Sequence, residues 1–387
     1  MKTSRLIERF QEVFGKGREP DIYRAPGRVN LIGEHTDYNG GLVLPIAIDL
    51  STYGLFRPST TDRIRLYSEN LDSLKEIELG KLSRRRGDWT DYVCGVLSGL
   101  ESSNRTISGF DLYLNSEIPV GSGLSSSAAL EVVTAVGAID TLNLAKPDDE
   151  ELVKLCQRAE NDFVGANTGI MDQYASYLGR AGDALLIDTS IPSHRHVKLE
   201  LEGYEIVVID TTVSHTHGNS EYNRRREECE MALKEVNKIT EGSDYGSLSQ
   251  IRPDQLEGLL PGLGDELSNR VEHVVRENKR VVEAANLFRQ GKIREAGELF
   301  FASHSSLRNL YEVSCPELDF LVEFARKESI PGARMTGGGF GGSTIHLVPQ
   351  NQIEDYTGKT EREFEDEFGI LPDIFPVSPG DGAKYQN

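Results

Sequence analysis

The chain has 387 residues, 38% of them hydrophobic and 27% charged, which is the composition of a folded protein with two domains or one large one. Its 62 acidic and 42 basic residues give a formal net charge of −20, which disfavours contact with nucleic acid or an anionic membrane. The apolar runs fall short of the ~20 residues that a membrane-spanning helix needs, and four scattered cysteines fit neither a disulfide framework nor a zinc ribbon. These properties predict a cytoplasmic protein.

The first half of the chain is predicted to mix short strands with helices. The spacing of apolar residues indicates helices at 3–14, 89–100, 128–144, 148–164 and 170–178. Extended segments are expected at 21–32, 42–56, 64–67, 74–79 and 109–115. In the last of these, alternation predicts that Phe110, Leu112 and Leu114 point into the core. The helix at 128–144 is apolar on nearly every side and is therefore expected to be buried.

The second half of the chain is predicted to place a long helical region between groups of strands. The expected elements are strands at 184–188 and 205–210, a charge-rich helical stretch from 221 to about 289, and a glycine-rich segment at 332–347 that ends in a strand. Strands and helices follow each other without regular βαβ units, which favours an α+β fold over a doubly wound sheet. The change in pattern near residue 190 predicts two domains, residues 1–190 and residues 191–387.

A loop of glycines and serines is the first pattern that points to a function. It has the sequence PVGSGLSSSAAL at 119–130. The two glycines let the backbone approach a ligand closely, and free N–H groups at the start of the following helix favour a phosphate. A serine hydroxyl there can also ligate Mg²⁺, a hard cation that prefers oxygen. The alternative is a serine-capped helix after a glycine turn, for which one serine would suffice.

Other nucleotide-binding motifs are incomplete in this chain. Ile353 stands where a Walker A loop ending in TGKT would need its first glycine. Gly337, Gly339 and Gly342 have the GxGxxG spacing, but a predicted strand follows them where a dinucleotide-binding fold needs a helix. The HRD and DFG triplets of protein kinases do not occur. The loop at 119–130 therefore indicates a small-molecule kinase of another type.

A second functional pattern lies at 24–41, where charged residues stand among glycines. Glu34, His35 and Asp37 share one short turn, and Arg28 precedes it. Carboxylates accept hydrogen bonds and arginine donates them, so such a turn can bind adjacent hydroxyl groups of a sugar. A solvated turn with a salt bridge is the alternative interpretation.

These segments resemble the motifs of the galactokinase family. GRVNLIGEHTDYNG at 27–40 is similar to the galactokinase signature, the loop at 119–130 resembles the phosphate loop of the wider GHMP small-molecule kinase superfamily, and MTGGGFGG at 335–342 resembles its third motif. Further similar segments are GIMDQ at 169–173, SEYN at 220–223 and YEVSCPELD at 311–319. The resemblance runs in order through most of the chain. It implies a two-domain GHMP kinase fold, with a mixed-sheet N-terminal domain, an α/β C-terminal domain and the active site between them.

The resemblance implies that the protein uses ATP and Mg²⁺. The residues expected to contact ATP are Ser68, Trp89, Gly121, Ser122, Gly123, Leu124, Ser125, Ser126 and Ser127. Ser127 and Glu160 are expected to ligate the Mg²⁺. Glu160 has apolar neighbours along its predicted helix, where a carboxylate needs a partner or a metal, and a buried Glu–Arg pair is the alternative. For Trp89 the alternative is an ordinary core position.

The same resemblance implies catalytic roles for Asp172 and Arg28. Asp172 is expected to accept the proton of the sugar's anomeric hydroxyl as that oxygen attacks the γ-phosphate, and Arg28 is its expected partner. The two must then meet in the fold; a surface acid on a helix is the alternative for Asp172. The residues expected to bind the sugar are Glu34, His35, Thr36, Asp37, Gly169 and Tyr222.

The implied reaction converts ATP and galactose into galactose 1-phosphate and ADP. Two other functions are compatible with the resemblance. One is a sugar 1-kinase that acts on N-acetylgalactosamine or L-arabinose. The other is a non-catalytic sugar sensor, which the presence of Arg28, Ser127 and Asp172 disfavours. The expected partners are galactose and ATP, without nucleic acid or membrane, and the expected assembly is a monomer or a weak homodimer.

Overall fold

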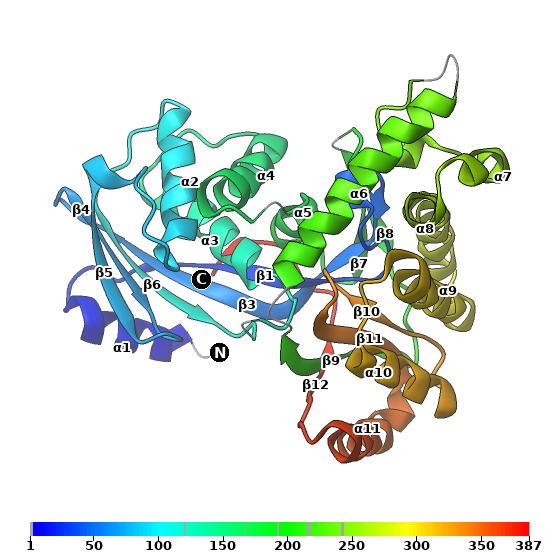
Figure 1. Ribbon diagram of the computed structural model, residues 1–387. Helices are drawn as coiled ribbons and strands as arrows, with labels where there is room; N and C mark the ends of the chain where they lie inside the picture. Colours follow the sequence, from blue (N-terminus) through cyan, green and yellow to red (C-terminus); the bar gives the residue numbers. More distant parts are fainter. Residues whose placement is uncertain are drawn as a thin grey trace.

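The structure, a computed structural model, describes residues 3–119, 121–166, 168–191, 193–214, 218–240 and 244–386 (Figure 1). Its helices are α1 (Thr3–Phe14), α2 (Thr90–Ser102), α3 (Ser126–Thr141), α4 (Asp149–Arg158), α5 (Met171–Leu178), α6 (Gly218–Ile239), α7 (Leu256–Leu259), α8 (Asp265–Arg289), α9 (Ile293–Ser306), α10 (Pro316–Lys327) and α11 (Ile353–Phe368). Its strands are β1 (Asp21–Asn30), β2 (Leu42–Val43), β3 (Pro45–Pro58), β4 (Arg63–Ser68), β5 (Ser73–Glu78), β6 (Phe110–Ser116), β7 (Asp183–Asp188), β8 (Ser193–Lys198), β9 (Tyr204–Ser214), β10 (Ala333–Thr336), β11 (Gly341–Pro349), β12 (Asp373–Val377) and β13 (Lys384–Gln386).

The first sheet has the strand order β13-β1-β3-β6-β4-β5 and packs on both of its faces. Helices α2 and α3 cover one face, and α1 covers the other (Figure 1). On β6, Phe110, Leu112 and Leu114 are buried, as the alternation predicts. Tyr113 points to the opposite face and is buried as well, because it packs against α1 and stacks on Tyr67. Alternation therefore identified one buried face of this strand but not the second.

The other two sheets are smaller, and one of them joins the early strand β2 to later strands. A four-stranded antiparallel sheet, β10-β11-β9-β12, packs against α10 and α11, and a three-stranded sheet, β2-β7-β8, packs against α8. The last strand, β13, returns to pair with β1. Mixed sheets and separate helices of this kind confirm the predicted α+β class. The domain boundary near residue 190 stays a prediction.

Two predicted helices differ from the observed ones. The prediction of one long helical stretch from 221 to 289 is wrong over most of 244–264, where Pro253 and Pro261 lie among turns and the single-turn helix α7 between α6 and α8. The helix expected at 148–164 is α-helical only as far as Arg158 and continues as a π-helical turn, Ala159–Val164. Such turns are often found at functional sites, and this one carries Glu160.

Within the part of the chain that the structure describes, none of the helices has the length and apolar character needed to cross a bilayer.

Candidate active site

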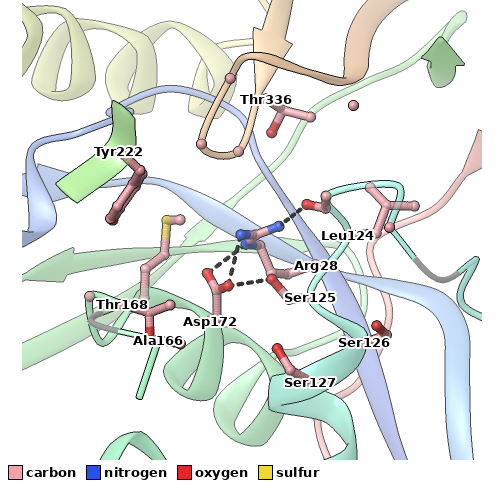
Figure 2. A pocket seen from close by; sticks show the side chains of 18 of the residues that line it. Arg28, Leu124, Ser125, Ser126, Ser127, Ala166, Thr168, Asp172, Tyr222 and Thr336 are labelled. Atoms are coloured by element: carbon pink, nitrogen blue, oxygen red, sulfur yellow. Dashed lines mark hydrogen bonds and ion pairs between the residues drawn. The ribbon is translucent and has the colours of Figure 1, made fainter. Parts of the chain in front are cut away.

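A cavity of about 640 Å³ lies where the two predicted halves of the chain meet. Most of its lining comes from the end of β1, the turn at 34–37, the loop and first turn of α3, and the stretch 160–172, together with the start of α6 and the glycines at 337–342 from the second half of the chain. Figure 2 shows Arg28 and Asp172 facing each other in this cavity, with Ser125 beside them and Ser127 at the start of α3. Segments that are far apart in the sequence therefore form a single site.

The glycine-serine loop (residues 119–127) presents its backbone to the cavity. Gly121 and Gly123 have φ angles of +86° and +76°, and Ser125, the residue before α3, has a φ of +60°. The Ser125 hydroxyl makes no capping hydrogen bond to the helix; it donates to Asp172 Oδ2 instead. This geometry argues against a serine that serves only as a helix cap. The open N–H groups and positive end of α3 favour an anion at this position.

Arg28 and Asp172 form a two-pronged ion pair. Arg28 Nε lies 2.7 Å from Asp172 Oδ1, and Arg28 Nη2 lies 2.8 Å from Oδ2. Arg28 Nη1 donates to the carbonyl of Gly123 at 2.6 Å, which ties the pair to the glycine-serine loop. The two residues are 144 positions apart, so the predicted meeting of Arg28 and Asp172 is confirmed. A guanidinium that bonds both oxygens in this way fixes the orientation of the carboxylate.

The negative charge of Asp172 acts on two other acidic side chains of the cavity lining, Asp37 and Glu160. Burial raises the pKa of Asp37 to about 6, and the negative charge of Asp172 adds to the effect. Burial and Asp172 likewise raise the pKa of Glu160, which hydrogen bonds from Ser127, Thr168 and Gln173 only partly offset. A cation would relieve this crowding of carboxylates. Ser127 and Glu160 together offer the hard oxygen ligands that suit Mg²⁺.

Glu34 also lines the cavity and accepts hydrogen bonds from several donors. Its Oε2 lies 2.5 Å from Arg334 Nη2 and accepts from Asn30 Nδ2 at 2.8 Å. Its Oε1 accepts from the backbone N–H of Gly337 at 3.0 Å. The carboxylate is buried, and burial raises its pKa above the ordinary value despite Arg334. Glu34 is thus fixed in one orientation by residues from both halves of the chain.

His35 is neutral and packs among aromatic rings. Burial lowers its pKa to about 3. Its Nε2 lies 3.2 Å from the carbonyl of Gly338, which can only accept, so we assign the proton to Nε2; Nδ1 then accepts from Tyr38 Oη at 2.7 Å. The ring of Tyr222 lies with its centroid 5.4 Å from that of His35. This group forms an apolar wall beside the carboxylates.

Four predicted ligand-binding residues lie outside the cavity lining: Thr36, Ser68, Trp89 and Ser122. Thr36 and Ser122 are fully buried, and their hydroxyls bond to backbone carbonyls within their own loops. Ser68 ends the strand β4 between β5 and β6, and Trp89 packs against the main hydrophobic core. Their predicted contacts with ligands stay predictions.

Several residues of the lining were not predicted as site residues. They include Tyr92 of α2, Thr168, and Asn223 of α6. Asn223 and Thr168 are direct neighbours of the predicted residues Tyr222 and Gly169, and Tyr92 lies three residues after Trp89. The hydroxyl of Thr168 donates to Glu160 at 2.8 Å, a contact that depends on the fold and has no pattern in the sequence. The glycines at 337–342, which belong to the segment that resembles the third motif, line the site directly.

Three family models match this chain. The model described as "Galactokinase galactose-binding signature" matches residues 8–58, "GHMP kinases N terminal domain" matches residues 91–180, and "GHMP kinases C terminal" matches residues 284–357.

Curated and solved relatives agree with these matches. The chain is 42% identical to the galactokinase of Thermosipho africanus over 93% of its own length and 98% of that protein, and 37% identical to the galactokinase of Bacillus subtilis over 97% of each. Among solved structures it is similar to Lactococcus lactis galactokinase complexed with galactose, with a TM-score of 0.94 and 38% identity over 99% of both chains. The mevalonate kinase of Methanococcus jannaschii shares the fold, with a TM-score of 0.68 at 21% identity.

Proposed function

The chain belongs to the galactokinase family of the GHMP kinases, and on this premise we propose which residues carry out its reaction, the ATP-dependent phosphorylation of galactose. The observation that carries the proposal is the ion pair between Arg28 and Asp172, which stands between the glycine-serine loop and the acidic turn around Asp37. In this position, a carboxylate can reach a sugar hydroxyl on one side while phosphate is held on the other.

We propose that Asp172 accepts the proton of the anomeric hydroxyl of galactose. As that oxygen bonds to the γ-phosphorus, the bond from phosphorus to the oxygen of the β-phosphate breaks, and ADP leaves. Arg28 orients the Asp172 carboxylate, and its positive charge also favours the transferring phosphoryl group. The Ser125 hydroxyl, which donates to Asp172, fixes the second oxygen of the carboxylate.

We propose that the glycine-serine loop binds the phosphates of ATP through the backbone N–H groups at the start of α3. Ser127 and Glu160 would hold Mg²⁺. The donor set supports this: a hydroxyl and a carboxylate lie in hydrogen-bond contact, and burial and a neighbouring acid disfavour the charge on Glu160. When bound, the metal neutralises phosphate charge.

The turn at 33–42, hereafter the sugar turn, is the proposed galactose-binding element. Glu34 and Asp37 would accept hydrogen bonds from sugar hydroxyls, and Tyr222 would offer its ring and hydroxyl. Gly169 faces Asp37 so closely that a Cβ at that position would lie 1.5 Å from Asp37 Oδ2. Gly169 would therefore leave room for the Asp37 carboxylate.

Gly169→Ala is expected to raise the KM for galactose by about tenfold or more, because the methyl group displaces the Asp37 carboxylate from the sugar. The KM for ATP should change little. Steady-state kinetics with each substrate varied in turn measures both constants. Gly258→Ala is the matched control, since a Cβ at that position meets nothing within 4 Å. An unchanged KM for galactose in Gly169→Ala would show that Asp37 does not bind the sugar.

The choice of sugar is tested by measuring ADP release with galactose, N-acetylgalactosamine and L-arabinose. We expect galactose to have the highest kcat/KM, by roughly tenfold or more, because a site that bonds each hydroxyl rejects sugars of different shape. A higher kcat/KM with either other sugar would assign the protein to a related sugar 1-kinase. Failure to release ADP with all three, together with measurable galactose binding, would support the sensor instead.

We also propose that the protein resides in the cytoplasm and is a monomer or a weak homodimer. All four cysteines are free and buried, which suits a reducing compartment.

A further inference from the structure

The side of the sugar turn that faces away from the cavity lies against one face of α8. His273, Glu277 and Asn278 of this helix each bond to the backbone of the turn. His273 and Glu277 are four residues apart and share one face of α8, and Asn278 directly follows Glu277. None of the three lines the cavity. They touch the turn only from behind.

Glu277 fixes the first residue of the turn. Its Oε1 accepts from the backbone N–H of Gly33 at 3.0 Å and from Ser303 Oγ at 2.6 Å, and its Oε2 accepts from Arg280 Nε at 2.6 Å. Burial alone would raise its pKa, but the neighbouring cation Arg280 overcomes this and the pKa is about 2. Gly33 has a φ of +106°, and a Cβ there would lie 2.9 Å from Val281 of the same helix. The backbone just before Glu34 is therefore fixed by α8.

His273 fixes the next peptide. It is fully buried, and burial lowers its pKa to about 4, so the ring is neutral at pH 7. Its Nε2 lies 3.1 Å from the carbonyl of Glu34, which can only accept, and this places the ring proton on Nε2. Nδ1 then accepts from Ser306 Oγ at 2.8 Å. The peptide that carries the Glu34 side chain is thereby bonded to α8.

Asn278 fixes the far end of the turn. Its Oδ1 accepts from the backbone N–H of Leu42 at 2.8 Å. A Cβ on Gly41 would lie 2.6 Å from the same oxygen, so the turn approaches the helix as closely as glycine allows. Both ends of the turn are thus hydrogen-bonded to the same helix.

We infer that Glu277, His273 and Asn278 are positioning residues that determine how tightly and how selectively the sugar turn binds galactose. The inference rests on the proposal that this turn binds the sugar. The backbone of the turn carries the Glu34 and Asp37 side chains, and a shift of about 1 Å in such a group is enough to misalign a bound substrate. Residues 273–278 lie between the matched N-terminal and C-terminal family segments, which end at 180 and begin at 284.

The inference is tested in the full chain with Glu277→Gln, measuring galactose affinity by calorimetry and both KM values by ADP release. We expect the Kd and KM for galactose to rise about tenfold, the KM for ATP to stay within about twofold, and the preference for galactose over its C4 epimer glucose to fall. Asp111→Asn is the matched control. Asp111 is likewise a buried carboxylate, on β6 of the first sheet, paired with Arg57 and Arg65 and outside the cavity lining, so galactose affinity should not change.

Two milder substitutions test the inference even if Glu277→Gln fails to fold. Asn278→Ala removes one neutral hydrogen bond and should raise the galactose Kd by about threefold or more. His273→Gln keeps an N–H for the Glu34 carbonyl and should bind galactose better than His273→Leu. Unchanged galactose affinity in Glu277→Gln and Asn278→Ala would overturn the inference, as would equal losses of galactose and ATP affinity. Calorimetry measures galactose binding without turnover. If the wild-type protein bound galactose but released no ADP, the proposed catalysis would be wrong, and the effect of these substitutions on galactose binding could still be measured.

Discussion

Asp172→Asn is expected to lower kcat by roughly 10³-fold while galactose still binds. The amide has nearly the shape of the carboxylate and can still accept one hydrogen bond from Arg28, but it cannot take up the proton of the sugar hydroxyl. The loss should therefore appear in kcat, with a much smaller change in galactose Kd. A coupled assay of ADP release gives the first quantity, and calorimetry with galactose gives the second.

A control on the same helix separates chemistry from folding in this experiment. Ser176 lies one turn after Asp172 on α5 and donates to the carbonyl of Pro26 at 2.7 Å without lining the cavity. Ser176→Ala should change kcat by no more than about twofold, since it removes one neutral hydrogen bond of the helix. Wild-type kcat in Asp172→Asn would show that Asp172 is not the proton acceptor. A comparable loss of kcat in Ser176→Ala would show that the loss in Asp172→Asn comes from displacement of α5.

Glu160→Gln is expected to lower kcat/KM for ATP by about 10²-fold and to raise the Mg²⁺ concentration needed for half-maximal rate. The variant removes the negative charge that would attract the metal but keeps the size of the side chain. It also keeps an oxygen for the bonds from Thr168 and Gln173, both 2.8 Å from Glu160 Oε2. Initial rates at fixed ATP over a range of Mg²⁺ concentrations measure the shift.

Glu131 provides a matched control for this variant. It is fully buried, and Gln173 Nε2 donates to it at 3.1 Å, as the same amide does to Glu160. Burial and the charge of Glu160 raise the pKa of Glu131 well above its ordinary value. Glu131 does not line the cavity, so Glu131→Gln should leave the Mg²⁺ dependence as it is. An equal shift in both variants would argue against Glu160 as the metal ligand.

The parts of the site that the sequence predicted are those whose function depends on a local pattern. The glycines and serines at 119–127 form their loop through the φ angles of a few neighbouring residues. The partnership of Arg28 and Asp172 followed from the family resemblance, and the fold brings the two within 2.7 Å. Short strands such as β4 and β5 were located within one or two residues, because their alternation is also local.

The parts that the sequence did not predict depend on what lies across the fold. The burial of Tyr113 requires α1, nearly a hundred residues earlier in the chain, to cover the second face of the sheet. The hydroxyl of Thr36 turns away from the cavity because the carbonyls of Gly33 and Leu42 lie within 2.8 Å of it, a consequence of how the turn closes. Prolines at 253 and 261 did signal the break between α6 and α8, and the charge-rich pattern around them obscured it.

The hydrogen bonds and the ion pair between Glu34 and residues near the end of the chain have a consequence for the protein during its synthesis. Glu34 emerges from the ribosome early, whereas the backbone N–H of Gly337 that binds its carboxylate is made 303 residues later, just after Arg334. A buried carboxylate without its partners is strongly unfavourable, so in the nascent chain this turn should stay hydrated and unformed. Chains of this size commonly fold through intermediates. A nascent chain could thus bear Arg28, the glycine-serine loop and Asp172 without yet being able to select its sugar.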